Sequence, residues 1–220
     1  STNGFAGWSD DKKALYISSN KRNPKFFDIW KLDTTTWKPT LMYQNDSGYS
    51  LSGMSRSERY VALTKDHTTD KNDLYLYDRT KKTMKRRSND NEATWNASAF
   101  EKNDSVMYYI TNDGSEFSYL VKYNLDNGKA EKEINLPADE FGEGITIFNN
   151  KIYQLTWQNN RVHEYDATTF QKIRDFDWPF QGWGITHTDS ELLVSTGSSN
   201  FYYVDPITFK VKKIVGVTDN

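Results

Sequence analysis

A phrase that occurs five times along the chain constrains its fold more than any other feature. Each copy is a strand rich in aromatic and aliphatic residues that ends in an acidic or amide residue, followed by a short turn containing Thr or Gly and a second strand. The copies are marked by Asp33, Asp78, Asn124, Asp166 and Asp205, which lie 45, 46, 42 and 39 residues apart. A strand repeat of this length is typical of propeller blades. The sequence therefore predicts an all-β fold, a five-bladed β-propeller with four antiparallel strands per blade.

The repeat runs from end to end without a linker, which favours a single β-propeller domain over residues 1–220. The predicted blades cover about residues 1–45, 46–90, 91–137, 138–179 and 180–220. In the first blade we expect strands at residues 4–9, 14–18, 27–32 and 40–44. Apolar and polar residues alternate most clearly in the second and third strand of each blade, and this period of two argues against helix.

Composition narrows the class of protein further. Aromatic residues make up 15% of the chain, enough to fill the interfaces between sheets. The net charge of -2 provides no basic field for nucleic acid, so nucleic acid is not expected as a partner. The absence of cysteine excludes disulfides, thiolate zinc sites and a cysteine nucleophile. No signal peptide or apolar span is recognised, and we expect a soluble monomer that does not bind membranes, in an undetermined compartment.

Residues 1 to about 134 resemble the TolB-like propellers, which also form the gating domains of prolyl-oligopeptidase-type peptidases. The resemblance is carried by WSDDKKALYISSN, SRSERYVALTKD and FEKNDSVMYYITND, each similar to that family's turn followed by an aromatic strand. These motifs specify a blade and imply no chemistry.

Residues from about 139 to 219 instead resemble glutaminyl cyclase of the plant and bacterial type, also called glutamine cyclotransferase. The resemblance is carried by FGEGITIFNNKIYQLTW, YDATTFQKI, QGWGIT and STGSSNFYYVDPITF. It implies a five-bladed propeller, commonly exported, that closes an N-terminal glutamine into pyroglutamate and releases ammonia. The change of resemblance near residues 135–138 suggests an engineered hybrid, although a natural relative with divergent early blades stays open.

The second resemblance also implies site residues. Glu143 matches the family's catalytic glutamate, and Trp157 and Trp183 match tryptophans of its substrate pocket. Gly142 and Gly144 are interpreted as clearing space for a ligand beside the strand. Aligning FGEGITI with QGWGITH places Glu143 and Trp183 at equivalent inner-strand positions. The other blades offer Gly4, Ser50 and Asn96 there, and Asn96 is included among the substrate-binding candidates.

Counterparts of the family's polar site residues from its other blades are missing. We therefore expect a propeller scaffold with an incomplete site and little or no catalysis. Two alternatives remain: an active glutaminyl-peptide cyclotransferase acting on peptides with N-terminal glutamine, or a module that binds peptides or sugars at the channel mouth. Glu143 as a solvated loop residue, and the two tryptophans as packing between blades, are the structural alternatives.

The three histidines are scattered, so no metal site and no cofactor is predicted. His67 is expected in a loop, His163 on a solvated strand, and His187 as a channel-lining or hydrogen-bonded residue.

Overall fold

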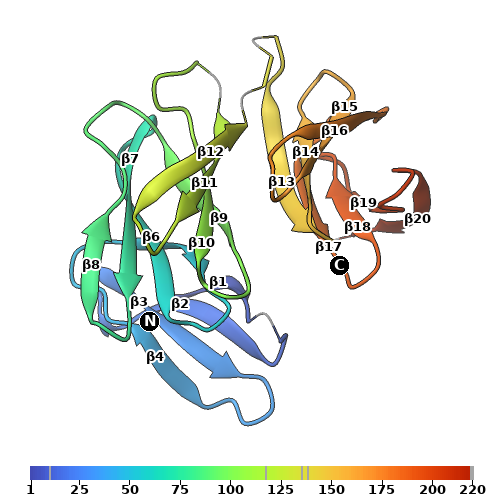
Figure 1. The fold of residues 1–220 in the computed structure, drawn as a ribbon. Coiled ribbons are helices and arrows are strands. Elements are labelled where there is room, and N and C mark those ends of the chain that lie inside the picture. The colour runs from blue at the N-terminus through green and yellow to red at the C-terminus, as the bar shows by residue number, and fades with distance from the viewer. Residues whose placement is uncertain (10, 117, 135, 138, 219–220) are drawn as a thin grey trace. The chain divides into compact units, whose positions relative to one another are not determined.

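The computed structural model describes residues 1–9, 11–116, 118–134, 136–137 and 139–218. Within these ranges every regular element is a β-strand, and the strands form five four-stranded antiparallel sheets (Figure 1). The predicted fold class is confirmed: the chain is an all-β, five-bladed β-propeller with four strands per blade. The described residues include no helix that is long and apolar enough to span a membrane.

In every blade the four strands are neighbours in the order in which they occur in the sequence. The first blade contains β1 (Asn3–Trp8), β2 (Ala14–Asn23), β3 (Phe26–Asp33) and β4 (Pro39–Tyr43). The second contains β5 (Ser50–Met54), β6 (Tyr60–Thr68), β7 (Lys71–Asp78) and β8 (Thr83–Arg86). The third contains β9 (Trp95–Phe100), β10 (Val106–Thr111), β11 (Tyr119–Asn124) and β12 (Lys129–Ile134).

The fourth blade contains β13 (Gly142–Phe148), β14 (Lys151–Thr156), β15 (Arg161–Asp166) and β16 (Lys172–Asp177). The fifth contains β17 (Gly184–His187), β18 (Leu192–Ser195), β19 (Asn200–Val204) and β20 (Val211–Gly216). The largest difference from the strands predicted in the first blade is the length of β2, which continues to Asn23. There the β2–β3 hairpin extends beyond the shared part of the sheet, with Asn23 paired to Phe26.

The chain divides into two compact units. Unit 1 comprises Ser1–Gly114 with Val121–Glu131, and unit 2 comprises Ser115–Leu120 with Lys132–Asn220. Unit 1 thus holds the first two blades and most of the third, whereas unit 2 holds the fourth and fifth.

The repeated acidic or amide residue forms the same turn in all five blades. Asp33 Oδ1 accepts hydrogen bonds from the backbone N–H groups of Thr35 and Thr36, at 2.9 and 2.6 Å. The equivalent pair of bonds, to the residues two and three positions further on, is 2.7–3.0 Å long at Asp78, Asn124, Asp166 and Asp205. In each turn the fourth residue after this side chain has a positive φ: Trp37, Lys82, Gly128, Phe170 and Phe209. The sequence signature of the repeat is therefore a turn signature.

The first hairpin of the fourth blade differs from that of the first three. In the first three blades the residue directly after the inner strand, which is Ser9, Ser55 or Glu101, donates its N–H to the carbonyl five residues further on, at 2.9–3.0 Å. In the fourth blade Asn149 and Asn150, at φ 50° and 59°, form a two-residue turn with the positive φ pair of a type I′ hairpin. The fourth blade therefore differs from the first three in the backbone of this hairpin.

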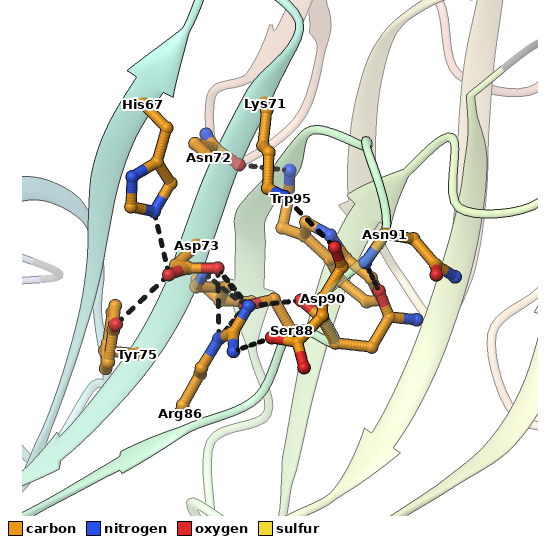
Figure 2. A network of polar contacts seen from close by, with 12 residues as sticks. His67, Lys71, Asn72, Asp73, Tyr75, Arg86, Ser88, Asp90, Asn91 and Trp95 are labelled. Atoms are coloured by element: carbon orange, nitrogen blue, oxygen red, sulfur yellow. Dashed lines mark hydrogen bonds and ion pairs between the residues drawn. The ribbon is translucent and has the colours of Figure 1, made fainter.

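The second blade carries a buried polar network around Asp73 on β7 (Figure 2). The Asp73 carboxylate accepts hydrogen bonds from Arg86 at 2.5 and 3.0 Å and from Ser88 Oγ at 3.0 Å, and it lies 2.9 Å from His67 Nε2. Burial alone would raise the pKa of Asp73, but the bonds from His67, Ser88 and Arg86 outweigh it and lower that pKa to about 2. The prediction of His67 as a loop residue is wrong, because it lies on β6.

Unit 2 has a core in which aromatic rings fill the space between its two sheets. Trp178 is 1% exposed and lies edge-on to Tyr202 and Phe209, with ring centroids 5.6 and 5.5 Å apart. The same cluster includes five aliphatic residues with no exposure to solvent: Leu155, Val162, Leu192, Val194 and Val204. This core holds together the sheets of the fourth and fifth blades. Glu143 lies on the inner strand of one, β13, and Trp183 directly precedes the inner strand of the other, β17.

Candidate functional site

Glu143 lies at an irregularity in the pairing of β13. Gly142 pairs with Thr156 and Ile145 with Gln154, so three steps along β13 match two along β14. The extra residue falls at Glu143 or Gly144, and such a bulge redirects the side chains next to it. The Glu143 carboxyl is half-buried, and within the described part of the chain it has no hydrogen bond or ion pair. Burial raises the pKa of Glu143 above its ordinary value.

The glycines around Glu143 allow close packing of protein atoms. Gly144 donates its N–H to the Trp183 carbonyl at 3.1 Å. A Cβ at Gly144 would lie 2.8 Å from Gly184 Cα, and one at Gly142 would lie 2.6 Å from Gln154 Nε2. The space beside both glycines is thus filled by β17 and by the side chains of Gln154 and Leu136, and not left for a ligand as the sequence interpretation had it.

The two tryptophans frame this segment with exposed rings. Trp157 is 40% exposed, and its N–H donates to the Phe141 carbonyl at 2.9 Å. Phe141 itself is 43% exposed and meets Trp157 edge-on, with centroids 6.2 Å apart. Trp183 is 54% exposed, and its indole covers Gly197, where a Cβ would lie 2.7 Å from the ring. Three exposed aromatic rings, two of them in contact, therefore belong to the same pair of sheets as Glu143.

The pairing register relates the equivalent positions of the five inner strands. Gly4, Ser50 and Asn96 pair with Ser18, Thr64 and Ile110, each the fifth residue of the strand that follows. Glu143 lies between residues paired with the sixth and the fourth residue of β14, and Trp183 directly precedes β17. Asn96 is exposed on β9 and belongs to unit 1, whereas Glu143, Trp157 and Trp183 all belong to unit 2.

Sequence reasoning missed a buried array behind this segment. His163 on β15 is fully buried, and its ring nitrogens lie 2.6 Å from Glu140 Oε2 and 2.6 Å from Asp175 Oδ1. The prediction of a solvated His163 is wrong because β15 is covered on both faces, with four of its six residues buried. The run of large side chains at residues 161–165 (RVHEY) was the sequence signal that could have indicated burial of this strand.

The third histidine of the chain lies on the surface. His187 ends β17, is exposed, and its Nδ1 lies 2.7 Å from the Thr188 carbonyl oxygen. Among the described residues no group of three or more His, Cys, Asp or Glu side chains has a geometry that could hold a metal ion.

Fold and site together define a β-propeller that presents a desolvated carboxyl group and exposed aromatic rings at its fourth and fifth blades. The sequence model of the family described as glutamine cyclotransferase matches residues 80–220. The chain belongs to this family.

The glutaminyl-peptide cyclotransferase of Arabidopsis thaliana is 33% identical over 95 residues, which is 43% of this chain and 30% of the relative. The chain therefore aligns with less than a third of the length of this curated relative.

Two solved structures share the fold at low identity. A prolyl endopeptidase matches with a TM-score of 0.70 and 12% identity, over 97% of this chain and 35% of that chain. TolB from Acinetobacter baumannii matches with a TM-score of 0.62 and 15% identity, over 93% of this chain and 52% of that one. At these identities the likeness concerns the fold alone.

The family match also bears on the proposed boundary between blade types. It begins at residue 80, upstream of the predicted change at residues 135–138. Residues 135 and 138 themselves lie outside the described residues. A hybrid origin stays a prediction.

Proposed function

We propose that the chain carries out the reaction for which its family is named, closing an N-terminal glutamine into pyroglutamate with Glu143 as the proton-transfer group. The observation that supports this most is the state of the Glu143 carboxyl, which is half-buried, free of partners among the described residues, and shifted to a higher pKa. Carboxyl groups that serve structure are usually paired, whereas an unpaired, desolvated one is suited to proton transfer.

The chemistry requires one proton to be moved. The neutral α-amine of the substrate attacks its own side-chain amide carbon, a C–N bond forms, and the bond to the amide nitrogen breaks as ammonia leaves. The amine must lose a proton and the leaving nitrogen must gain one. The Glu143 carboxylate can accept the first and return it to the second, and its raised pKa brings it closer to the amine's pKa of about 8.

The aromatic rings supply a surface for the rest of the substrate. Trp157, Phe141 and Trp183 are each exposed by two fifths or more. Flat rings of this kind hold the aliphatic part of a glutamine side chain and restrict it to folded conformers in which amine and amide are close. Asn96 as a further substrate contact stays a prediction from the sequence, because it belongs to unit 1 and the proposed surface to unit 2.

A variant series tests the proposal. Incubation with a peptide that begins with glutamine is expected to release ammonia, and Glu143→Gln, which preserves shape, should lower kcat by roughly 10²–10⁴-fold. The matched control is Glu191→Gln in the same unit, where Glu191 pairs with Lys212 at 2.9 Å on the surface. That control should retain full activity.

Other outcomes would decide between the alternatives. No ammonia release from the unaltered protein would support the expectation of a scaffold with little or no catalysis. Saturable quenching of tryptophan fluorescence by the peptide, without its conversion, would instead favour a binding module. Turnover that survives Glu143→Gln would contradict the proposed role of Glu143.

A further inference from the structure

The array around His163 links the interior of the fourth blade to the segment that carries Glu143. His163 Nε2 lies 2.6 Å from Glu140, which is 3% exposed, and Nδ1 lies 2.6 Å from Asp175 on the neighbouring strand β16. Each carboxylate has a second cationic partner: Arg161 Nη1 lies 3.2 Å from Glu140, and Lys172 Nζ lies 2.7 Å from Asp175. The burial of His163 and Glu140 makes any break in this array costly.

The number of protons in the array follows from these contacts. A neutral imidazole has one N–H donor, and an ionised carboxylate has none. Two carboxylate contacts at 2.6 Å therefore require a second proton, carried by the imidazole or by one of the carboxyl groups. Burial alone would raise the pKa of Asp175, but its contacts with Lys172 and His163 outweigh this and lower it.

The groups that face His163 come from three strands and one preceding segment. Asp175 and Lys172 come from β16, Arg161 and Tyr165 from β15, and Glu140 from the segment before β13, with the Tyr165 ring centroid 6.0 Å from that of His163. Gln154 on β14 is its cross-strand partner and is uncharged. Each of the two carboxylates thus contacts the His163 ring and one cationic side chain.

Glu140 fixes the chain three residues before Glu143. Its N–H donates to the Pro137 carbonyl at 3.0 Å, while its side chain is held by His163 and Arg161. On either side of it, the Asp139 carbonyl accepts from Asn159 Nδ2 at 2.9 Å and the Phe141 carbonyl accepts from the Trp157 N–H at 2.9 Å. The segment that enters β13 is therefore held by one buried side chain and by backbone bonds beside it.

We propose that His163 is a positioning residue, which acts through Glu140 to hold the start of β13 and so sets the direction of the Glu143 carboxyl. The proposal rests on the proposed function of Glu143.

The experiment compares His163→Gln with His187→Gln, a control at an exposed histidine of the same unit. Gln can replace only part of the array, so the amide hydrogens of Glu140 and Trp157 should exchange at least about tenfold faster, as expected when local opening becomes easier. With the Gln-initiated peptide, kcat should fall by roughly tenfold to a hundredfold while KM changes little, because misplacement of a catalytic group by about 1 Å costs that much. The control should leave exchange and kcat unchanged.

A second variant covers the case in which His163→Gln does not fold. Glu140→Gln preserves the shape of the side chain but cannot retain the charge contacts, and it should show the same faster exchange and lower kcat. Unfolding of both variants under conditions where His187→Gln is stable would itself contradict a role confined to positioning.

The outcomes separate this proposal from the one on which it rests. If the folded variants exchange the amide hydrogens of Glu140 and Trp157 as slowly as the unaltered protein, the positioning role of His163 is overturned, whatever their activity. A variant with faster exchange but full kcat would also overturn it. An inactive unaltered protein would overturn the proposed function, and the exchange rates would then still show whether the array holds the segment.

Discussion

At the scale of single residues, the site depends on backbone contacts that only glycine permits. Gly144 lies where β13 and β17 approach, and its N–H bonds to the Trp183 carbonyl at 3.1 Å. This bond ties the residue after Glu143 to one of the two tryptophans. The motif GEG therefore has a packing role in addition to any role in catalysis.

We expect Gly144→Ala to lower the free energy of unfolding by about 1–3 kcal/mol, because its Cβ would meet backbone atoms at 2.8–2.9 Å that cannot move independently. Urea unfolding followed by circular dichroism measures this. The control is Gly216→Ala on β20, where the nearest atom would be the end of the Asn200 side chain at 3.6 Å. Equal stability of the two variants would show that β13 and β17 are not packed as closely as described.

At the scale of elements, the turn after the third strand is the unit that repeats. Backbone N–H bonds lower the pKa of Asp33, Asp166 and Asp205. An Asp whose pKa is lower in the folded than in the unfolded chain stabilises the fold above its unfolded pKa of about 3.9 and loses that contribution as the pH falls through its folded pKa. Asn124 forms the same turn without titrating.

Asp205→Asn should therefore preserve the turn, whereas Asp205→Ala should lower the melting temperature at neutral pH. Below about pH 4 the melting temperature of the unaltered protein should approach that of the Ala variant, while the Asn variant should depend less on pH. Thermal unfolding between pH 7 and pH 2.5 provides the measurement. Identical pH dependence of the Asp and Asn forms would contradict the proposed contribution of this carboxylate.

For the second blade, a larger change in stability is expected from the network around Asp73 shown in Figure 2. Asp73→Asn should lower the free energy of unfolding at pH 7 by about 1–3 kcal/mol, because donors of Arg86 and Ser88 lose their charged acceptor. Since the pKa of Asp73 is lowered to about 2, this difference should be complete above about pH 4 and vanish towards pH 2. The control is Asp90→Asn, because Asp90 bonds the same Arg86 at 2.5 Å but its side chain is 94% exposed. If Asp90→Asn lowered the free energy of unfolding by as much as Asp73→Asn, burial of Asp73 would not be the cause of its larger contribution.

At the scale of the whole molecule, all five blades share the turn after the third strand, whereas the first hairpin differs between the first three blades and the fourth. In repeat proteins each repeat contacts its neighbours, and such repeats depend on one another for stability. The single domain over residues 1–220 stays a prediction.

We expect unit 1 and unit 2 to unfold in one transition. Hydrogen exchange measured in increasing denaturant should show one midpoint for β6 and β7 of unit 1 and for β14 and β15 of unit 2. Gly144→Ala, in unit 2, should shift the midpoint of both sets equally, and so should Asp73→Asn in unit 1. Two separate midpoints, or a shift confined to the altered unit, would contradict the single domain.

The sequence by itself determined the features that depend on residues close together in the chain, which are the strands, the turns and their order. The period of about 40 residues, the alternation within strands and the Asp or Asn turns specify local hydrogen bonds, so the twenty strands, their order and the five blades follow from it. Glu143, Trp157 and Trp183 could be named from their motifs. Only the tertiary structure decided that Glu143 lies at a bulge without partners among the described residues, that Gly144 meets β17, and that His163 lies between Glu140 and Asp175. Burial depends on which residues distant in sequence pack together.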